Sequence, residues 1–385
     1  MSEKFKMIAK TYQGVEDVLA DELRALGAED LEKIRRGISF YGDEALMYKA
    51  NLALRTASRI LLPIEEFTAK SDDELYREAK KINWEDYFDV IDTFKIDTVV
   101  HSSFFNHSRY AGLKVKDAIA DWFMERFQKR PSVNIESPTI LIHIHISEDK
   151  VTVNLDSSGE PLFKRGYKTL NFDAPLKEDL AAAMVLLSGW KKDSNFYDPF
   201  CGSGTILTEA AMIACNIAPN LKREHFGFMG WRGFDKELFN EVVKSLEANQ
   251  KEFKYKIIGG DITPRAVQIT KTHVKNLGFE NIIEVHDCSF KDFKPKEGKG
   301  ILISNLPYGE RLKETDLNIL YKQVGNGFKQ NYKGKDCWIL SSNDEALKYV
   351  GLKPDKKIPL YNGKLECRYQ KFTIYDGSKK AKYQD

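Results

Sequence analysis

The sequence contains no long hydrophobic run. Its 385 residues include no stretch of about 18 apolar residues, so we expect no transmembrane helix. The first ten residues, MSEKFKMIAK, are too polar for a signal peptide. These two absences predict a cytoplasmic protein that does not act at a membrane.

Cysteine is scarce, and its spacing forms no motif. Five cysteines occur, an odd number, and no Cys-x-x-Cys pair is present, so neither a disulfide framework nor a zinc site is indicated. His143 and His145 alternate along one strand-like segment, but no third metal ligand lies near them in the sequence. We therefore expect no bound metal ion and reduced cysteines.

The chain also lacks a large excess of charge. It has 59 Lys and Arg against 57 Asp and Glu, a net charge of +2, which excludes a histone-like or a wholly acidic protein. The charge is unevenly distributed along the chain. Residues 1–165 carry 24 basic and 29 acidic residues, and residues 166–385 carry 35 basic and 28 acidic residues. Nucleic-acid contact in the acidic first part would therefore need a local basic patch. The candidates for that patch are Lys114, Lys116, Arg126, Lys129 and Arg130.

Helices and short strands are mixed in the first part of the chain. Apolar residues recur at helical spacing over 15–26, 73–90 and 115–128, and 38–41 resembles a short strand. The alternating segments ILIHIHIS and KVTVNLDSS meet at a polar turn and predict a hairpin. This mixture is typical of small α+β units.

The second part of the chain has a regular alternation instead. Strand-like and helical runs follow one another in the order 195–199, 205–218, 255–261, 264–277, 282–287, 300–305, 316–330 and 336–342. Such alternation predicts a mostly parallel sheet with helices on both faces. Two further strand-like segments flank Gly363-Lys364 and predict an antiparallel hairpin at the sheet edge.

A glycine-rich loop joins the first of these strands to its helix. The segment Asp-Pro-Phe-Cys-Gly-Ser-Gly-Thr occupies 198–205, and glycines at such a junction let a ligand approach the backbone. The pattern is not Gly-x-Gly-x-x-Gly because Leu207 stands at the last position. The next acid at a strand end is Asp261, 59 residues beyond Gly202, whereas a dinucleotide site wants one after about 20 residues. The distance between Gly202 and Asp261 requires an insertion, at 219–254. The alternative interpretation of the glycine-rich loop is a simple tight turn between a strand and a helix.

Two acids at later strand ends suit a nucleoside ligand with a zwitterionic tail. Asp261 would accept hydrogen bonds from ribose hydroxyls, and Asp287 would accept one from an adenine amino group. Both acids follow strands of the same predicted sheet. By the switch-point rule, the carboxyl ends of those strands line the ligand crevice.

The segment Asn-Leu-Pro-Tyr-Gly follows the fourth strand. An exocyclic amine of a nucleobase is a poor nucleophile, so a catalyst needs acceptors that orient it and stabilise developing positive charge. Asn305 supplies a side-chain carbonyl, and Leu306 supplies a backbone carbonyl held before Pro307. Tyr308 offers a stacking face for a base removed from its helix. The alternative is an ordinary strand-ending turn.

These motifs resemble the class I S-adenosylmethionine-dependent methyltransferases that modify exocyclic amines. Together with LFKRGYK (162–168) and APLKEDLAAAMVLLSGW (174–190), the form NLPYG resembles the THUMP-domain RNA guanine-N2-methyltransferases of 23S rRNA. The resemblance implies an α/β fold in which a Rossmann-like methyltransferase domain, with a mostly parallel seven-stranded sheet and a terminal antiparallel hairpin, follows two α+β modules. The implied parts are a ferredoxin-like subdomain (1–65), a THUMP domain (66–160), a linker (161–180) and the methyltransferase domain (181–385).

The same resemblance implies roles for individual residues around S-adenosylmethionine and the target base. It places Asp198, Gly202, Gly204 and Thr205 at the methionine end of the cofactor, Asp261 at its ribose and Asp287 near its adenine. Further expected cofactor contacts are Phe200, Cys201, Ile262 and Cys288, and the expected base clamp is Asn305, Leu306, Pro307 and Tyr308. Cys201 stands in the glycine loop, which favours a small packing residue over a nucleophile.

Leu306 departs from the wider group, in which proline is commoner at this position. The departure favours guanine N2 over adenine N6 as the target. We expect methylation of a guanosine in 23S rRNA by a monomer that binds RNA. The alternatives left open are a tRNA guanine-N2-methyltransferase, an adenine-N6 methyltransferase and an RNA-binding scaffold without catalysis.

Basic residues near the linker and in the first part could contact phosphate groups of the RNA. The expected RNA contacts are Lys114, Lys116, Lys164, Arg165 and Lys168. For Lys164, Arg165 and Lys168, in the expected linker, the alternative to phosphate contact is a solvent-exposed connector. The aromatic and basic insertion 219–254 would serve as a substrate lid or as an ordinary covering helix hairpin.

Overall fold

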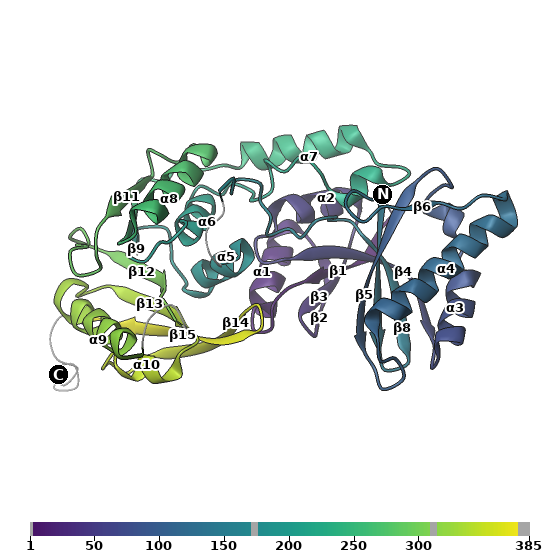
Figure 1. Ribbon diagram of the computed structural model, residues 1–385. Coiled ribbons are helices and arrows are strands. Elements are labelled where there is room, and N and C mark those ends of the chain that lie inside the picture. The colour runs from purple at the N-terminus through teal and green to yellow at the C-terminus, as the bar shows by residue number, and fades with distance from the viewer. Residues whose placement is uncertain (1–2, 171–175, 309–313, 376–385) are drawn as a thin grey trace.

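The computed structural model describes residues 3–170, 176–308 and 314–375 and contains two sheets (Figure 1). An eight-stranded sheet forms the amino-terminal part of the molecule, and a seven-stranded sheet forms the carboxy-terminal part. Along the described chain, no helix combines the length and apolar character that crossing a membrane requires.

One continuous sheet serves both amino-terminal modules. Its strands, in spatial order, are β2 (Glu29–Ile34), β3 (Gly37–Gly42), β1 (Phe5–Lys10), β4 (Arg59–Thr68), β8 (Lys150–Asp156), β7 (Ile140–Ser147), β5 (Thr93–His101) and β6 (Ser132–Val133). The long strand β4 pairs with β1 on one side and with β8 on the other. The boundary expected between residues 65 and 66 therefore falls inside a strand that joins two smaller α+β units.

The sequence pattern did not predict β4, which contains a proline. Pro63 lies at a register shift in the pairing with β8, where a strand tolerates a residue without a backbone N–H. The helices agree better with expectation, since α1 spans Glu16–Leu26 and α4 spans Ser108–Phe127. The start of α4 lies seven residues before the expected 115, because only its second half carries a continuous apolar stripe.

Helices cover this sheet and bury aromatic side chains against it. α2 (Glu44–Ala53) and α1 lie on the ferredoxin-like unit, and α3 (Asp72–Lys81) and α4 lie on the second unit. A short helix, η1 (Trp84–Asp86), follows α3. The core of the second unit contains the buried side chains of Trp84, Phe88, Phe94, Trp122 and Phe123.

The carboxy-terminal sheet has the expected topology. Its strands, in spatial order, are β11 (Ile283–Asp287), β10 (Ile257–Asp261), β9 (Asn195–Asp198), β12 (Gly300–Asn305), β13 (Asp336–Ser341), β15 (Leu365–Thr373) and β14 (Lys356–Asn362). The first five are parallel, and β14 and β15 form an antiparallel hairpin at the edge. Its helices are α5 (Glu178–Leu187), α6 (Thr205–Ala214), α8 (Pro264–Leu277), α9 (Glu314–Asn331) and α10 (Asp344–Lys348).

The strand order reverses direction at β9. From this strand the chain proceeds to β10 and β11 on one side and to β12 and β13 on the other. In such sheets the ligand crevice opens at the carboxyl ends of the strands beside the reversal. The glycine loop after β9 and the Asn-Leu-Pro-Tyr segment after β12 are therefore neighbours, and this confirms the predicted α/β architecture.

The insertion 219–254 is neither a lid over the crevice nor a hairpin covering the sheet. It contains a short helix, η2 (Gly227–Gly230), and the helix α7 (Lys236–Ala248), which packs on α2 of the ferredoxin-like unit (Figure 1). Phe228, Phe234 and Phe239 surround the ring of Tyr48. Arg232 reaches the second unit and contacts the Asp89 carboxylate at 2.9 Å. We call this insertion the strap, because it joins the methyltransferase part to both amino-terminal units.

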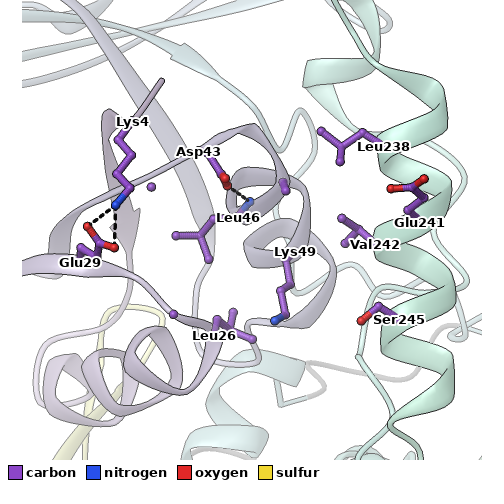
Figure 2. A pocket seen from close by; sticks show the side chains of 13 residues that line it. Lys4, Leu26, Glu29, Asp43, Leu46, Lys49, Leu238, Glu241, Val242 and Ser245 are labelled. Atoms are coloured by element: carbon purple, nitrogen blue, oxygen red, sulfur yellow. Dashed lines mark hydrogen bonds and ion pairs between the residues drawn. The ribbon is translucent and has the colours of Figure 1, made fainter. Parts of the chain in front are cut away.

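A cavity of about 400 Å³ lies between α2 and α7. Figure 2 shows Leu46 and Lys49 of α2 and Leu238 and Val242 of α7 among the side chains that line it. None of the residues that line the cavity belongs to the strand ends beside β9. The cavity is therefore a gap in the packing of the strap, and we do not assign the chemistry to it.

Candidate active site

The glycine loop is held in shape by helix α8. Gly204 has φ +80°, and a Cβ atom at that position would lie 2.5 Å from the Thr270 side chain, so only glycine fits. Thr270 Oγ1 donates to the Gly202 carbonyl at 2.7 Å, and His273 Nδ1 donates to the Ser203 carbonyl at 3.0 Å. The loop therefore presents its backbone to a ligand at the start of α6, where a helix favours negative charge.

Asp198 lies buried at the end of β9. Its Oδ1 accepts hydrogen bonds from Ser304 Oγ and, at 3.2 Å, from the Phe200 amide. Its Oδ2 is buried, and no group among the described residues donates to it. Burial raises the pKa of this carboxyl to about 7, although its hydrogen bonds oppose the rise. A buried carboxylate oxygen without a partner suits a cationic group of a ligand.

Asp261 and Asp287 end neighbouring strands in the same register. Asp261 accepts from the Gly202 amide at 3.0 Å and from the Thr263 amide at 2.9 Å, so this carboxylate also fixes the glycine loop. Asp287 is exposed at the surface. The structure thus brings the three predicted acids to the carboxyl ends of β9, β10 and β11.

Apolar side chains surround these acids. Ile262 is 71% exposed, which is unusual for isoleucine and leaves a flat apolar surface beside the Asp261 carboxylate. The ring of Phe200 stacks on Phe290 with centroids 5.3 Å apart. Cys201 is buried below the loop, as a packing residue would be, and Cys288 follows Asp287 and donates its amide to the Asp261 carbonyl at 3.1 Å.

The Asn-Leu-Pro-Tyr segment is fixed on both sides. The Leu306 amide donates to the Leu340 carbonyl at 3.1 Å, and Tyr321 Oη donates to the Pro307 carbonyl at 3.2 Å. Asn305 Oδ1 is buried, and within the described residues no donor reaches it. A buried amide oxygen without a partner is an acceptor kept for a ligand N–H. The rest of the motif, 309–313, lies outside the described residues.

The structure corrects the interpretation of Arg165 as an RNA contact. Arg165 is completely buried, and its Nε contacts Glu209 Oε1 of α6 at 3.4 Å. Its guanidinium also donates to the carbonyls of Leu162 and Arg55, each at 2.6 Å. The alternative of a solvated connector is equally wrong for this residue, because Arg165 joins the amino-terminal units to the methyltransferase domain.

The remaining basic candidates differ in exposure. Lys168 is largely buried and contacts Glu178 at 3.1 Å, so it belongs to the same interior cluster as Arg165. Lys164 is exposed and pairs with Glu160 at 2.6 Å. Lys114 and Lys116 lie on α4 and pair with Asp73 at 3.6 Å and with Asp117 at 2.6 Å. Lys114 and Lys116 are half-buried, and contact between RNA and these two lysines or Lys164 stays a prediction.

Sequence reasoning missed several residues that shape the site. Thr270 and His273 lie on the buried face of α8, and Tyr321 lies on the buried face of α9. In the sequence they are indistinguishable from core positions of amphipathic helices. Asn362 precedes a glycine and reads as a turn residue, although its side chain reaches Tyr308.

Comparison with protein families divides the chain into the same three parts. An RMKL-like methyltransferase domain matches residues 165–371, a THUMP domain matches 69–156, and an RlmL ferredoxin-like domain matches 6–61. The methyltransferase match alone covers more than half of the chain. It includes both the glycine loop and the Asn-Leu-Pro-Tyr segment.

Individual relatives match nearly the whole length of the chain. The ribosomal RNA large subunit methyltransferase K/L of Syntrophotalea carbinolica is 38% identical over 97% of this chain, which spans 54% of that relative's length. The Synechocystis protein slr0064, provisionally named an RNA methyltransferase, is 36% identical over 95% of this chain and 96% of its own. The structure of SMU.472, provisionally described as a methyltransferase and complexed with SAH, superposes with a TM-score of 0.87 at 33% identity, covering 98% of this chain and all of that one.

Proposed function

Because this chain belongs to the family of RMKL-like methyltransferases that carry a THUMP domain, we propose that it methylates the exocyclic N2 amine of a guanosine in 23S rRNA. One observation carries the choice of an amine as the target. Asn305 Oδ1 is a buried acceptor without a partner among the described residues, at the end of the strand beside the glycine loop. Such an acceptor suits an N–H group of a substrate.

S-adenosylmethionine is the cofactor, and the residues present fit it. The unpartnered Asp198 Oδ2 suits its amino group, and the glycine loop at the start of α6 suits its carboxylate. Asp261 would hold the ribose, and Asp287 with the exposed Ile262 would hold the adenine. The other expected contacts, Phe200, Cys201 and Cys288, would line the cofactor site beside these groups. When bound, the cofactor supplies an electrophilic methyl group.

The residues after β12 would prepare the target amine. Its lone pair is delocalised into the base, and acceptors at Asn305 Oδ1 and the Leu306 carbonyl would orient the amine and stabilise positive charge developing on nitrogen. The Tyr308 ring would stack on the flipped base. No proton acceptor of high basicity is required, because the methylated amine becomes acidic.

Two observations support guanine in rRNA as the target. Leu306 stands where proline is commoner across amino-methyltransferases, a departure that favours guanine N2 over adenine N6, and the K/L relative carries a large-subunit rRNA name. The excess of basic over acidic residues in 166–385 suits a domain that holds an RNA backbone near its crevice. We expect the protein to act in the cytoplasm as a monomer, on RNA and without a metal ion.

Cofactor affinity is expected to rise with pH up to about 7 and then to level off. The cofactor's amino group pairs with ionised Asp198, whose pKa burial raises to about 7. Below that value the carboxyl binds a proton that the cofactor must displace, so each pH unit costs up to about tenfold in affinity. Calorimetric titration across this range measures the effect. If Asp198→Asn shows the same pH profile as the wild type, Asp198 does not pair with the amino group.

Replacing Asp261 with alanine is expected to weaken cofactor binding by about 10- to 100-fold. The substitution removes an acceptor for the ribose and the two hydrogen bonds that fix the loop at Gly202 and Thr263. Calorimetry with S-adenosylmethionine measures the loss. The matched control is Glu280→Ala, an exposed acid on the loop after α8, which should leave the affinity unchanged. Unchanged affinity in Asp261→Ala would contradict the ribose role.

The nucleosides of a deletion strain test the choice of substrate. Mass spectrometry of its ribosomal and transfer RNA should show the loss of one N2-methylguanosine from 23S rRNA and no change in tRNA. Loss from tRNA instead would assign the tRNA alternative, and loss of N6-methyladenosine would assign the adenine alternative. Unchanged nucleosides together with cofactor binding in vitro would favour a scaffold without catalysis.

A further inference from the structure

We propose that Asn362, at the tip of the β14–β15 hairpin, is a positioning residue of the base clamp. Its amide fixes the Tyr308 hydroxyl and with it the ring that would stack on the target base. The inference rests on the proposed function, because it assigns the position of the ring that the function requires.

The contact between the hairpin and the clamp is direct. Asn362 Nδ2 donates to Tyr308 Oη at 2.9 Å, although the two residues lie 54 positions apart in the sequence. Asn362 is the last residue of β14 and pairs with Leu365 across a two-residue turn. Gly363 in that turn has φ +65°, which allows the tight reversal. The turn therefore brings the Asn362 amide over the half-buried phenol.

The same hydrogen bond acts on the ionisation of the phenol. Burial raises the pKa of Tyr308, and the side-chain hydrogen bond from Asn362 opposes the rise, as a donor to the phenol oxygen does. Loss of this donor would therefore remove the contact between the ring and the hairpin and would raise the pKa of Tyr308 further.

The amino-terminal module backs the hairpin. Gly14 approaches β14 so closely that a Cβ atom there would lie 3.0 Å from the Pro359 carbonyl oxygen. Val15 and Leu360 lie in one buried cluster, and Ile358 packs against it. Strand β14, which carries Asn362, therefore pairs with β15 on one side and packs against the ferredoxin-like unit. These contacts restrict the position of the Asn362 amide.

Asn362→Leu tests the proposal, because it keeps the approximate shape of the side chain but can neither donate to the phenol nor accept from it. The substrate is a 23S rRNA transcript, and methyl transfer is measured at saturating cofactor. We expect kcat to fall about 10- to 100-fold, as small misplacements of reacting groups do. The KM for the transcript and the cofactor affinity should stay within about twofold. The control Leu365→Ala alters the exposed cross-strand neighbour and should leave kcat unchanged.

A double-mutant cycle separates positioning from general damage to the hairpin. Tyr308→Phe keeps the stacking ring and breaks the same contact from the other side. The double variant Asn362→Leu with Tyr308→Phe should be no slower than the slower single variant, because both remove one interaction. Multiplied effects of the two substitutions, or an unchanged kcat in Asn362→Leu, would overturn the proposal.

A measurement without RNA distinguishes failure of this inference from failure of the proposed function. The ¹³Cζ signal of labelled Tyr308, identified by its loss in Tyr308→Phe, reports the ionisation of the phenol. Removing a donor should raise the pKa of Tyr308 in Asn362→Leu relative to the wild type and to Leu365→Ala. An unshifted titration overturns the positioning role. If the pKa of Tyr308 shifts in the variant but the wild type does not methylate the transcript, only the proposed rRNA function is contradicted.

Discussion

Asn305→Ala is expected to lower the rate of methyl transfer at least about 100-fold while cofactor affinity stays within about twofold. Removing one preorganised group that stabilises transition-state charge costs about 10²–10³ in kcat. Asn305 is the last residue of β12, the strand next to β9. Its side-chain oxygen is buried, and no group among the described residues donates to it. The residues expected to hold the cofactor, Asp198 and Asp261, do not hydrogen-bond to it.

The measurement combines single-turnover methylation of rRNA with calorimetric titration of the cofactor. The matched control is Asn281→Ala, an exposed asparagine before β11, whose side chain lies outside the site. The control should behave like the wild type in both assays. If methylation by Asn305→Ala persists within about tenfold of the wild-type rate, the assignment of the clamp is wrong.

Arg165→Ala is expected to produce the largest loss of stability, about 3–5 kcal/mol. Breaking a buried ion pair by removing one partner leaves the other partner uncompensated. Arg165 and Glu209 are both completely buried, and the guanidinium also satisfies the carbonyls of Leu162 and Arg55. The substitution therefore removes one of the contacts that join the amino-terminal units to helix α6.

Urea unfolding of Arg165→Ala beside Lys164→Ala measures this loss. Lys164 is the neighbouring residue, and its ion pair with Glu160 is exposed, so its removal should leave the unfolding midpoint nearly unchanged. Equal midpoints in the two variants would show that the buried pair does not hold the domains together. The comparison also tests directly whether Arg165 acts inside the protein or on RNA.

The parts of the site that the sequence predicted are those encoded by short segments at strand ends. Asp198 to Thr205 and Asn305 to Tyr308 are each contiguous, and the parallel sheet places both at the same edge. Local spacing therefore sufficed, because the alternation of strands and helices determines which ends meet. Residues 309–313 continue the second motif but lie outside the described residues.

The parts that could not be predicted depend on partners far away in the sequence. In the sequence, Arg165 has the features of a surface cation. In the fold it contacts Glu209, which lies 44 residues later, and Arg55, which lies 110 residues earlier. The strap shows the same dependence, because its aromatic residues pack on Tyr48 of the ferredoxin-like unit. A charged or aromatic residue carries no local signal that tells a buried contact from a surface one.

The most direct test of the account is methylation by the purified chain. The protein is incubated with unmodified 23S rRNA and S-adenosylmethionine, and the digested RNA is analysed by mass spectrometry. The account predicts N2-methylguanosine with the wild-type chain and none with Asn305→Ala. Methyl transfer to an adenine, or N2-methylguanosine formed equally well by both chains, would contradict it.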